Sequence, residues 1–173
     1  FQCGVELLPD SAWSEQYALW LALQLGCAEC TYLAGRFEDA SAFSDALLPK
    51  LRSMHEKADL YIMRMAIESS RNENARAIQL GRDALEMLGH PVPNTDSVFA
   101  QFVARAQAAL AMVGRAGELT NLPEVVDPHM IALANVLNAL VVPAYRGDKA
   151  LVTWIVHRNR YIACTHGMTT ATA

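Results

Sequence analysis

The chain has 173 residues, of which 53% are hydrophobic and 18% are charged, and its formal net charge is −4. This length suits one domain that can bury a core without a metal ion or disulfides, and the apolar content excludes a disordered chain. Because binding to phosphates needs clustered lysine and arginine, a mildly acidic chain excludes a general affinity for nucleic acid or anionic lipid.

Two helices are predicted at the start of the chain, since apolar residues recur at three- and four-residue spacing and no alternating, strand-like run appears. A cap at residues 9–11 precedes the first helix, which is expected to run to about Leu33. Residues 34–36 break it, and the second helix begins near Phe37, with an apolar stripe that reaches Leu51.

A third helix is expected over residues 56–70, and a fourth runs from the polar turn at 71–74 to Leu88. Gly89 then allows the chain to leave the helix, and the Pro-Val-Pro sequence at 91–93 forbids its continuation. The first half of the chain therefore predicts two helix pairs.

The second half predicts three more helices, at about residues 96–113, 128–145 and 149–166. Residues 119–126 form an expected loop, after which Asp127 is a cap and Pro128 takes the first helical position. Residues 168–173 are expected to begin an eighth helix.

The order helix, short turn, helix recurs in the first two pairs, and the second helix of each pair begins with an alanine, Ala40 or Ala77. Small residues let paired helices approach closely, and they stand at Ala28, Ala40, Ala46, Ala77, Gly81 and Ala84. This pattern resembles the tetratricopeptide repeat. The resemblance implies an all-α fold of about seven helices, in which antiparallel helix pairs stack as a right-handed superhelix.

Four longer phrases extend the resemblance to most of the chain, from about Leu19 to Thr165. They stand at residues 34–40, 77–93, 122–128 and 140–151. They resemble the degenerate tetratricopeptide-like segment of large bacterial signalling proteins. Those proteins carry an AAA-type predicted ATPase before this segment, and some also carry a serine/threonine kinase domain and a sensor histidine kinase.

We interpret residues 1–173 as a single helical-repeat domain, with two repeat-like pairs over 1–90 and more divergent pairs over 95–173. The chain opens on Phe1 without an initiator methionine or a basic-then-apolar leader, which indicates a segment of a longer protein. Apolar helix faces at such ends predict self-association.

No catalytic, cofactor-binding or metal-binding residue is predicted. The five histidines do not form an HExxH motif, and no glycine-rich phosphate loop occurs. The densest basic run, His157 to Arg160, is interpreted as a solvated helix face, and the other histidines as surface or turn residues. We therefore expect no enzyme activity and no cofactor in this segment.

The cysteines have no spacing typical of a secreted disulfide framework, so reduced thiols are expected. Cys27 and Cys30 form a CxxC, which can chelate zinc or form a redox pair. Since two further ligands are lacking nearby and the pair lies inside a predicted helix, core packing is the favoured interpretation.

No formally charged residue lies between Pro128 and Tyr145, so this stretch is a candidate membrane span. It contains His129, two asparagines and Pro143, and a span needs about 20 predominantly apolar residues. A buried helix of a soluble, cytoplasmic protein is the expectation, without membrane or nucleic-acid partners.

Aromatic side chains at helical spacing are more often core than ligand groove, but a peptide-binding surface is the functional alternative. The candidate surface residues are Trp13, Tyr17, Trp20, Tyr145 and Trp154.

These observations favour a non-catalytic scaffold or protein-interaction segment that links or regulates the ATPase and kinase domains of a signalling protein. Its expected partner is protein, either a neighbouring domain or another signalling protein. Two alternatives stay open, namely a helical ligand-sensing domain of a transcription regulator and a stand-alone peptide-binding repeat module.

Overall fold

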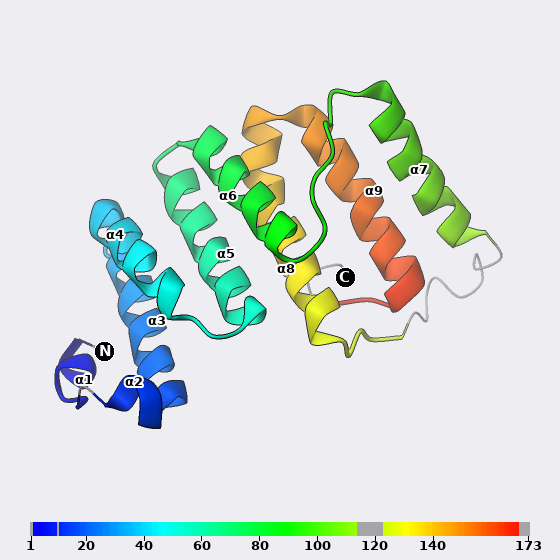
Figure 1. Cartoon of the computed structure of the whole chain (residues 1–173). Coiled ribbons are helices and arrows are strands. Elements are labelled where there is room, and N and C mark those ends of the chain that lie inside the picture. Colours follow the sequence, from blue (N-terminus) through cyan, green and yellow to red (C-terminus); the bar gives the residue numbers. More distant parts are fainter. Residues whose placement is uncertain (1, 10, 114–122, 170–173) are drawn as a thin grey trace. The chain divides into compact units, whose positions relative to one another are not determined.

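The computed structural model describes residues 2–9, 11–113 and 123–169. Over these residues the chain is all-helical, with nine α-helices and no β-strand (Figure 1). The expected all-α class is thus confirmed. The chain divides into two compact units, Phe1–Arg52 and Ser53–Ala173, and each is described by itself.

The first unit is a helix pair, α3 and α4, with two short helices that contact α3. Its elements are α1 (Gln2–Glu6), α2 (Ala12–Glu15), α3 (Tyr17–Leu33), α4 (Phe37–Leu47) and the 3₁₀ turn η1 (Leu48–Lys50). Its buried apolar side chains are Ala12, Trp20, Ala28, Ala40, Leu47 and Leu51. Ala28 and Ala40, two of the small residues expected between paired helices, are fully buried.

The long first helix expected from residue 11 to Leu33 is interrupted. Gln16 has φ −127° and ψ 44°, so the chain leaves helical geometry between α2 and α3. In α2 the Ser14 hydroxyl donates to the carbonyl of Ser11 at 2.8 Å, and serine side chains that bond to nearby backbone favour helix ends over helix interiors. Periodicity alone does not reveal this break.

The second unit contains five longer helices, α5 (Met54–Ser70), α6 (Asn74–Met87), α7 (Val98–Met112), α8 (Pro128–Gly147) and α9 (Lys149–His166). Helix α5 begins earlier than expected because Ser53 and Glu56 form a capping box. The Ser53 hydroxyl accepts from the Glu56 N–H at 3.1 Å, and the Glu56 carboxylate accepts from the Ser53 N–H at 2.9 Å.

Helix α8 occupies the centre of this unit (Figure 1). It packs on both helices of the preceding pair, α5 and α6, and it forms the next pair with α9. Helix α7 packs on α9 instead of on α8, the helix that follows it in sequence. The divergent half therefore contributes one pair, α8 and α9, and an additional helix on the far side of α9.

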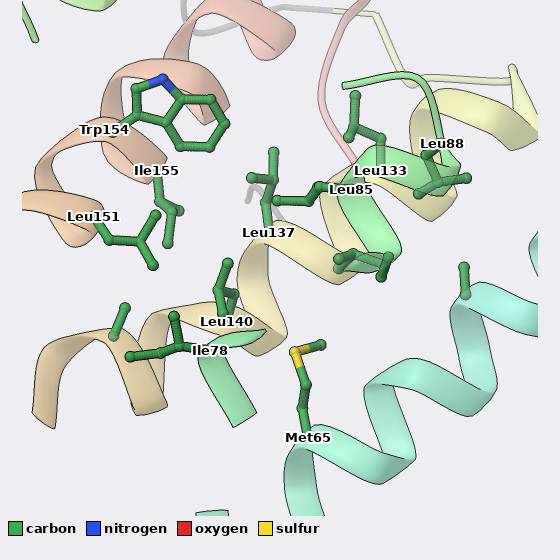
Figure 2. Close-up of a cluster of buried hydrophobic side chains, with 14 of the residues drawn as sticks. Met65, Ile78, Leu85, Leu88, Leu133, Leu137, Leu140, Leu151, Trp154 and Ile155 are labelled. Carbon is green, nitrogen blue, oxygen red and sulfur yellow. The ribbon is translucent and has the colours of Figure 1, made fainter. Parts of the chain in front are cut away.

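The core of the second unit gathers aliphatic side chains from α5, α6, α8 and α9 (Figure 2). The helices of this core approach one another closely at Gly81 of α6. A methyl group added to Gly81 would lie 2.5 Å from Cδ1 of Leu140 and 3.0 Å from Sδ of Met65. Glycine at this position therefore lets α6 lie against α5 and α8.

Among the described residues, α8 is the one helix long and apolar enough to cross a membrane by length and composition. It contacts α5, α6 and α9, and its buried residues include Leu133, Leu137 and Leu140, each 0% exposed. Such burial is what the core helix of a helical bundle requires, and length and composition alone are weak evidence for a span.

A short parallel β-bridge pairs Glu124 with Met168, just after the end of α9. The Met168 N–H donates to the Pro123 carbonyl at 2.8 Å, and the Val125 N–H donates to the Met168 carbonyl at 2.9 Å. The expected eighth helix is therefore wrong for Met168 and Thr169, since the chain is extended there. Residues 170–173, and residues 119–122 of the expected loop, lie outside the described residues.

Candidate functional site

A cavity of about 440 Å³ lies between the α6–α7 connection, α7 and α9. Its walls are mainly apolar and include Phe99, Val103, Trp154 and Tyr161, and its polar lining comes from His90, Gln107, His157 and Arg158. The described residues that line it include no aspartate or glutamate. A mostly apolar cavity with a few convergent polar groups is the usual form of a small-molecule site.

The end of α6 places His90 over this cavity. Gly89 adopts φ 77°, a left-handed conformation that glycine tolerates. The Gly89 N–H donates to the Glu86 carbonyl at 2.9 Å and the His90 N–H to the Leu85 carbonyl at 2.8 Å, which together form a Schellman cap. The capped turn fixes the imidazole next to α9.

Arg158 of α9 is half-buried in the wall of the cavity. Its Nη2 donates to Nδ1 of His90 at 2.8 Å, and its Cζ lies 5.2 Å from the ring centroid of Tyr161. Burial lowers the pKa of Arg158 below the usual arginine value, an effect that Tyr161 opposes. Arginine remains charged in proteins, so the cavity holds a partly desolvated cation whose neighbours are an imidazole and a phenol ring.

The contact with Arg158 requires a neutral imidazole at His90, because an arginine N–H can only donate. Burial is the first cause that lowers the pKa of His90, followed by the charge of Arg158 and then by His129 and His166. The rings of His90 and His129 lie 5.8 Å apart between centroids. Because Nδ1 accepts a hydrogen bond from arginine, the ring proton is assigned to Nε2.

His157 of α9 also lines the cavity. Its Nδ1 is buried and has no hydrogen-bond partner among the described residues. Burial lowers the pKa of His157, and the charges of Arg160 and Arg105 lower it further. A buried ring nitrogen without a partner costs about 1–3 kcal/mol.

The five aromatic residues proposed from the sequence are divided between the two units. Trp13, Tyr17 and Trp20 belong to the first unit, whereas Tyr145 lies on α8 and Trp154 on α9. Trp154 is 7% exposed and lines the cavity, while Tyr145 is 71% exposed.

In the first unit, the guanidinium of Arg52 contacts two of these aromatic residues, Trp13 and Tyr17. Its Cζ lies 4.0 Å from the ring centroid of Tyr17 and 5.2 Å from that of Trp13. The Arg52 N–H donates to the Tyr17 hydroxyl at 3.1 Å, and Tyr17 stacks on Trp20 at 5.8 Å between centroids. Trp20 is buried, so the outer part of this cluster is Trp13 and Arg52.

The interpretation of the basic run as a solvated helix face is wrong for three of its four residues. His157, Arg158 and Asn159 are half-buried, and Arg160 alone of the four is exposed. His90, predicted as a turn residue, does follow the end of α6 but packs against Arg158 and His129. One sequence signal could have indicated this cluster: the spacing of Trp154, Arg158 and Tyr161 puts them on one helical face.

The interpretation of the CxxC as core is wrong for Cys30, which is exposed, while Cys27 is half-buried. Both line a second cavity, of about 500 Å³, in the first unit, together with Arg36 and Asp39. The helices α3 and α4 leave the Cys30 side chain at the surface. Over the described residues, no group of three or more His, Cys, Asp or Glu side chains could hold a metal ion.

The outer face of α7 is apolar and exposed. Its exposed large side chains are Val98, Phe99, Phe102 and Leu110, with Val113 at the helix end. Their exposed fractions range from 66% for Phe102 to 83% for Val98. We call these five residues the α7 arc. Ala104 and Ala108, on the opposite face of the helix, are buried.

No protein-family model, no curated protein and no solved structure matches this sequence.

Proposed function

We propose that this chain is a non-catalytic protein-interaction segment, a scaffold within a cytoplasmic, multidomain signalling ATPase or kinase. The observation that carries the proposal is the α7 arc. Large exposed apolar side chains gathered on one face of a soluble protein commonly mark a site for another protein. Phenylalanine is also among the residues enriched at interfaces.

The arrangement of the second unit supports this proposal. Two antiparallel pairs, α5–α6 and α8–α9, adjoin each other through α8, which packs on both helices of the first pair. Helix pairs that stack by nearest-neighbour contacts build the extended surfaces of repeat proteins. The tetratricopeptide-like superhelix, and the parent protein that the sequence phrases resemble, are parts of the proposal.

The partner is proposed to be an apolar helix or groove of a neighbouring domain. Helix-in-groove recognition uses apolar side chains that recur along one face of a helix. Phe99 and Phe102 are three residues apart, and Leu110 lies eight residues further along the same face of α7. Burial of these side chains would stabilise a complex by about 25 cal/mol for each Å² of apolar surface removed from water.

Two measurements test this proposal. The reading frame on either side of the chain is expected to encode an ATPase or kinase domain. In that intact protein, Phe102→Ser is expected to change ATP hydrolysis or phosphotransfer severalfold, because the arc contacts the neighbouring domain. Glu86→Ser, at an exposed position on α6, is the matched control and is expected to have no effect. Equal activities of both variants would contradict the proposal.

A further inference from the structure

The cavity between α7 and α9 has the size and lining of a ligand site. At about 440 Å³ it lies within the range of roughly 300–1,000 Å³ that is usual for small-molecule sites. The indole of Trp154 and the rings of Phe99 and Tyr161 supply flat apolar walls. A molecule with an aromatic or compact aliphatic body fits such walls.

The charge of the residues that line the cavity suits an anionic ligand. The chain as a whole is acidic, yet the charged side chain in this lining is Arg158, and no carboxylate of the described residues lines the cavity with it. The hydrogen bond that the structure gives Arg158 uses one of its five N–H donors, on the neutral imidazole of His90. A half-buried cation without an anionic neighbour is costly, and a bound anion would offset that cost.

The number and shape of the donors narrow the ligand further. A guanidinium binds a carboxylate through two parallel hydrogen bonds. Over the part of the chain that the structure describes, the lining contains one arginine and no lysine, which matches a single negative charge better than the two charges of a phosphate monoester.

We propose that this cavity binds a small organic carboxylate, with the carboxylate on Arg158 and an aromatic or aliphatic body against Trp154 and Phe99. Phe99 belongs to both the cavity and the α7 arc, but ligand binding in the cavity does not require a protein on the arc.

Isothermal titration calorimetry of the 173-residue chain tests the proposal, with 3-phenylpropionate and indole-3-acetate as probes. Each acid is expected to bind at least about tenfold more tightly than its neutral amide, because the charge-assisted bonds to Arg158 are lost in the amide. Absence of binding by both acids at millimolar concentration would overturn the proposal. So would equal binding of acid and amide, or tighter binding of phenyl phosphate.

Three variants locate the site. Arg158→Gln is expected to weaken acid binding by about tenfold or more and to leave amide binding nearly unchanged. Arg146→Gln, at an exposed arginine of α8, is the control and is expected to bind like the parent chain. Ala100→Leu fills the cavity from α7 without removing the charge, so it is expected to abolish binding even if Arg158→Gln fails to fold. Full binding by Ala100→Leu, or an equal loss in Arg146→Gln, would overturn the assignment.

Discussion

Arg158 and His90 join two distant parts of the chain through a hydrogen bond of 2.8 Å from Nη2 to Nδ1. The bond ties α9 to the residue that follows the cap of α6. Because arginine can only donate, the bond requires a neutral imidazole with its proton on Nε2. Protonation of His90 would place two cations in contact and would break this link.

This link predicts that the second unit loses stability as the pH falls. The folded-state pKa of His90 lies below the usual histidine value of about 6.5. The unfolded chain therefore binds the proton first, and the stabilisation is complete above that value and lost as the pH falls through the folded-state pKa. The groups that face His90 are Arg158 and His166 of α9 and His129 of α8, which all oppose its protonation.

Urea unfolding between about pH 8 and about pH 5 measures this effect. The free energy of unfolding is expected to decrease with falling pH, and to decrease less in His90→Asn, whose amide oxygen accepts a hydrogen bond but does not titrate. Some dependence is expected to remain, because the pKa of His157 is lowered in the same direction. Parallel curves for the two proteins would show that His90 is not the linked group.

Gly81→Ala is expected to destabilise the second unit by about 1–3 kcal/mol through overpacking. The added methyl group would lie 2.5 Å from Cδ1 of Leu140 and 3.0 Å from Sδ of Met65, so these buried side chains would have to shift. Gln79→Ala, at an exposed position of the same helix, is the control. In Gly81→Ala/Leu140→Val the two effects are expected to be less than additive, because the smaller side chain relieves the contact. Chemical denaturation of each variant measures these effects, and strict additivity would argue against this contact.

Gly167→Ala is expected to destabilise the unit more than Gly89→Ala. Both glycines have positive φ, 107° and 77°. A methyl group on Gly89 would meet nothing within 4 Å, whereas one on Gly167 would collide with the carbonyl oxygen of Pro123. The substitution at Gly89 therefore costs only the left-handed conformation, about 1–2 kcal/mol, and the one at Gly167 also disrupts the bridge to Met168. Thermal unfolding compares them, and equal shifts would contradict the close approach of Pro123 to Gly167.

Phe102→Ser is expected to leave the stability of the isolated chain within about 0.5 kcal/mol of the parent value, because the side chain is 66% exposed. Leu137→Ala, at a fully buried position of α8, is expected to cost about 2–5 kcal/mol. Denaturant titration of both variants checks the contrast. A large loss in Phe102→Ser would mean that the α7 arc is covered within this chain and is not free for a partner.

The helices themselves were predictable because their signals are local. The end of α6 at Gly89 and the start of α8 at Asp127 and Pro128 follow from capping chemistry that neighbouring residues determine. Apolar periodicity does not predict the break at Gln16 or the capping box at Ser53. The periodicity continues across Gln16, and it carries no information about a cap at Ser53.

The cavity could not be predicted because it depends on which helices become neighbours. His90 and Arg158 are 68 residues apart in sequence, and they meet because α8 packs on both α6 and α9. The same packing buries Trp154, which the sequence offered as a surface residue. Helix pairing decides these positions, and no local signal records it.

Site-specific photo-crosslinking through the α7 arc tests the central claim most directly. A benzophenone amino acid is placed at Phe102 in the intact protein, with the same group at the exposed Glu86 as the control. The account predicts cross-links from position 102 to one defined surface of a neighbouring signalling domain or partner protein, and few from position 86. Cross-linking that is equally sparse, or equally unspecific, at both positions would contradict the role of this chain as an interaction segment.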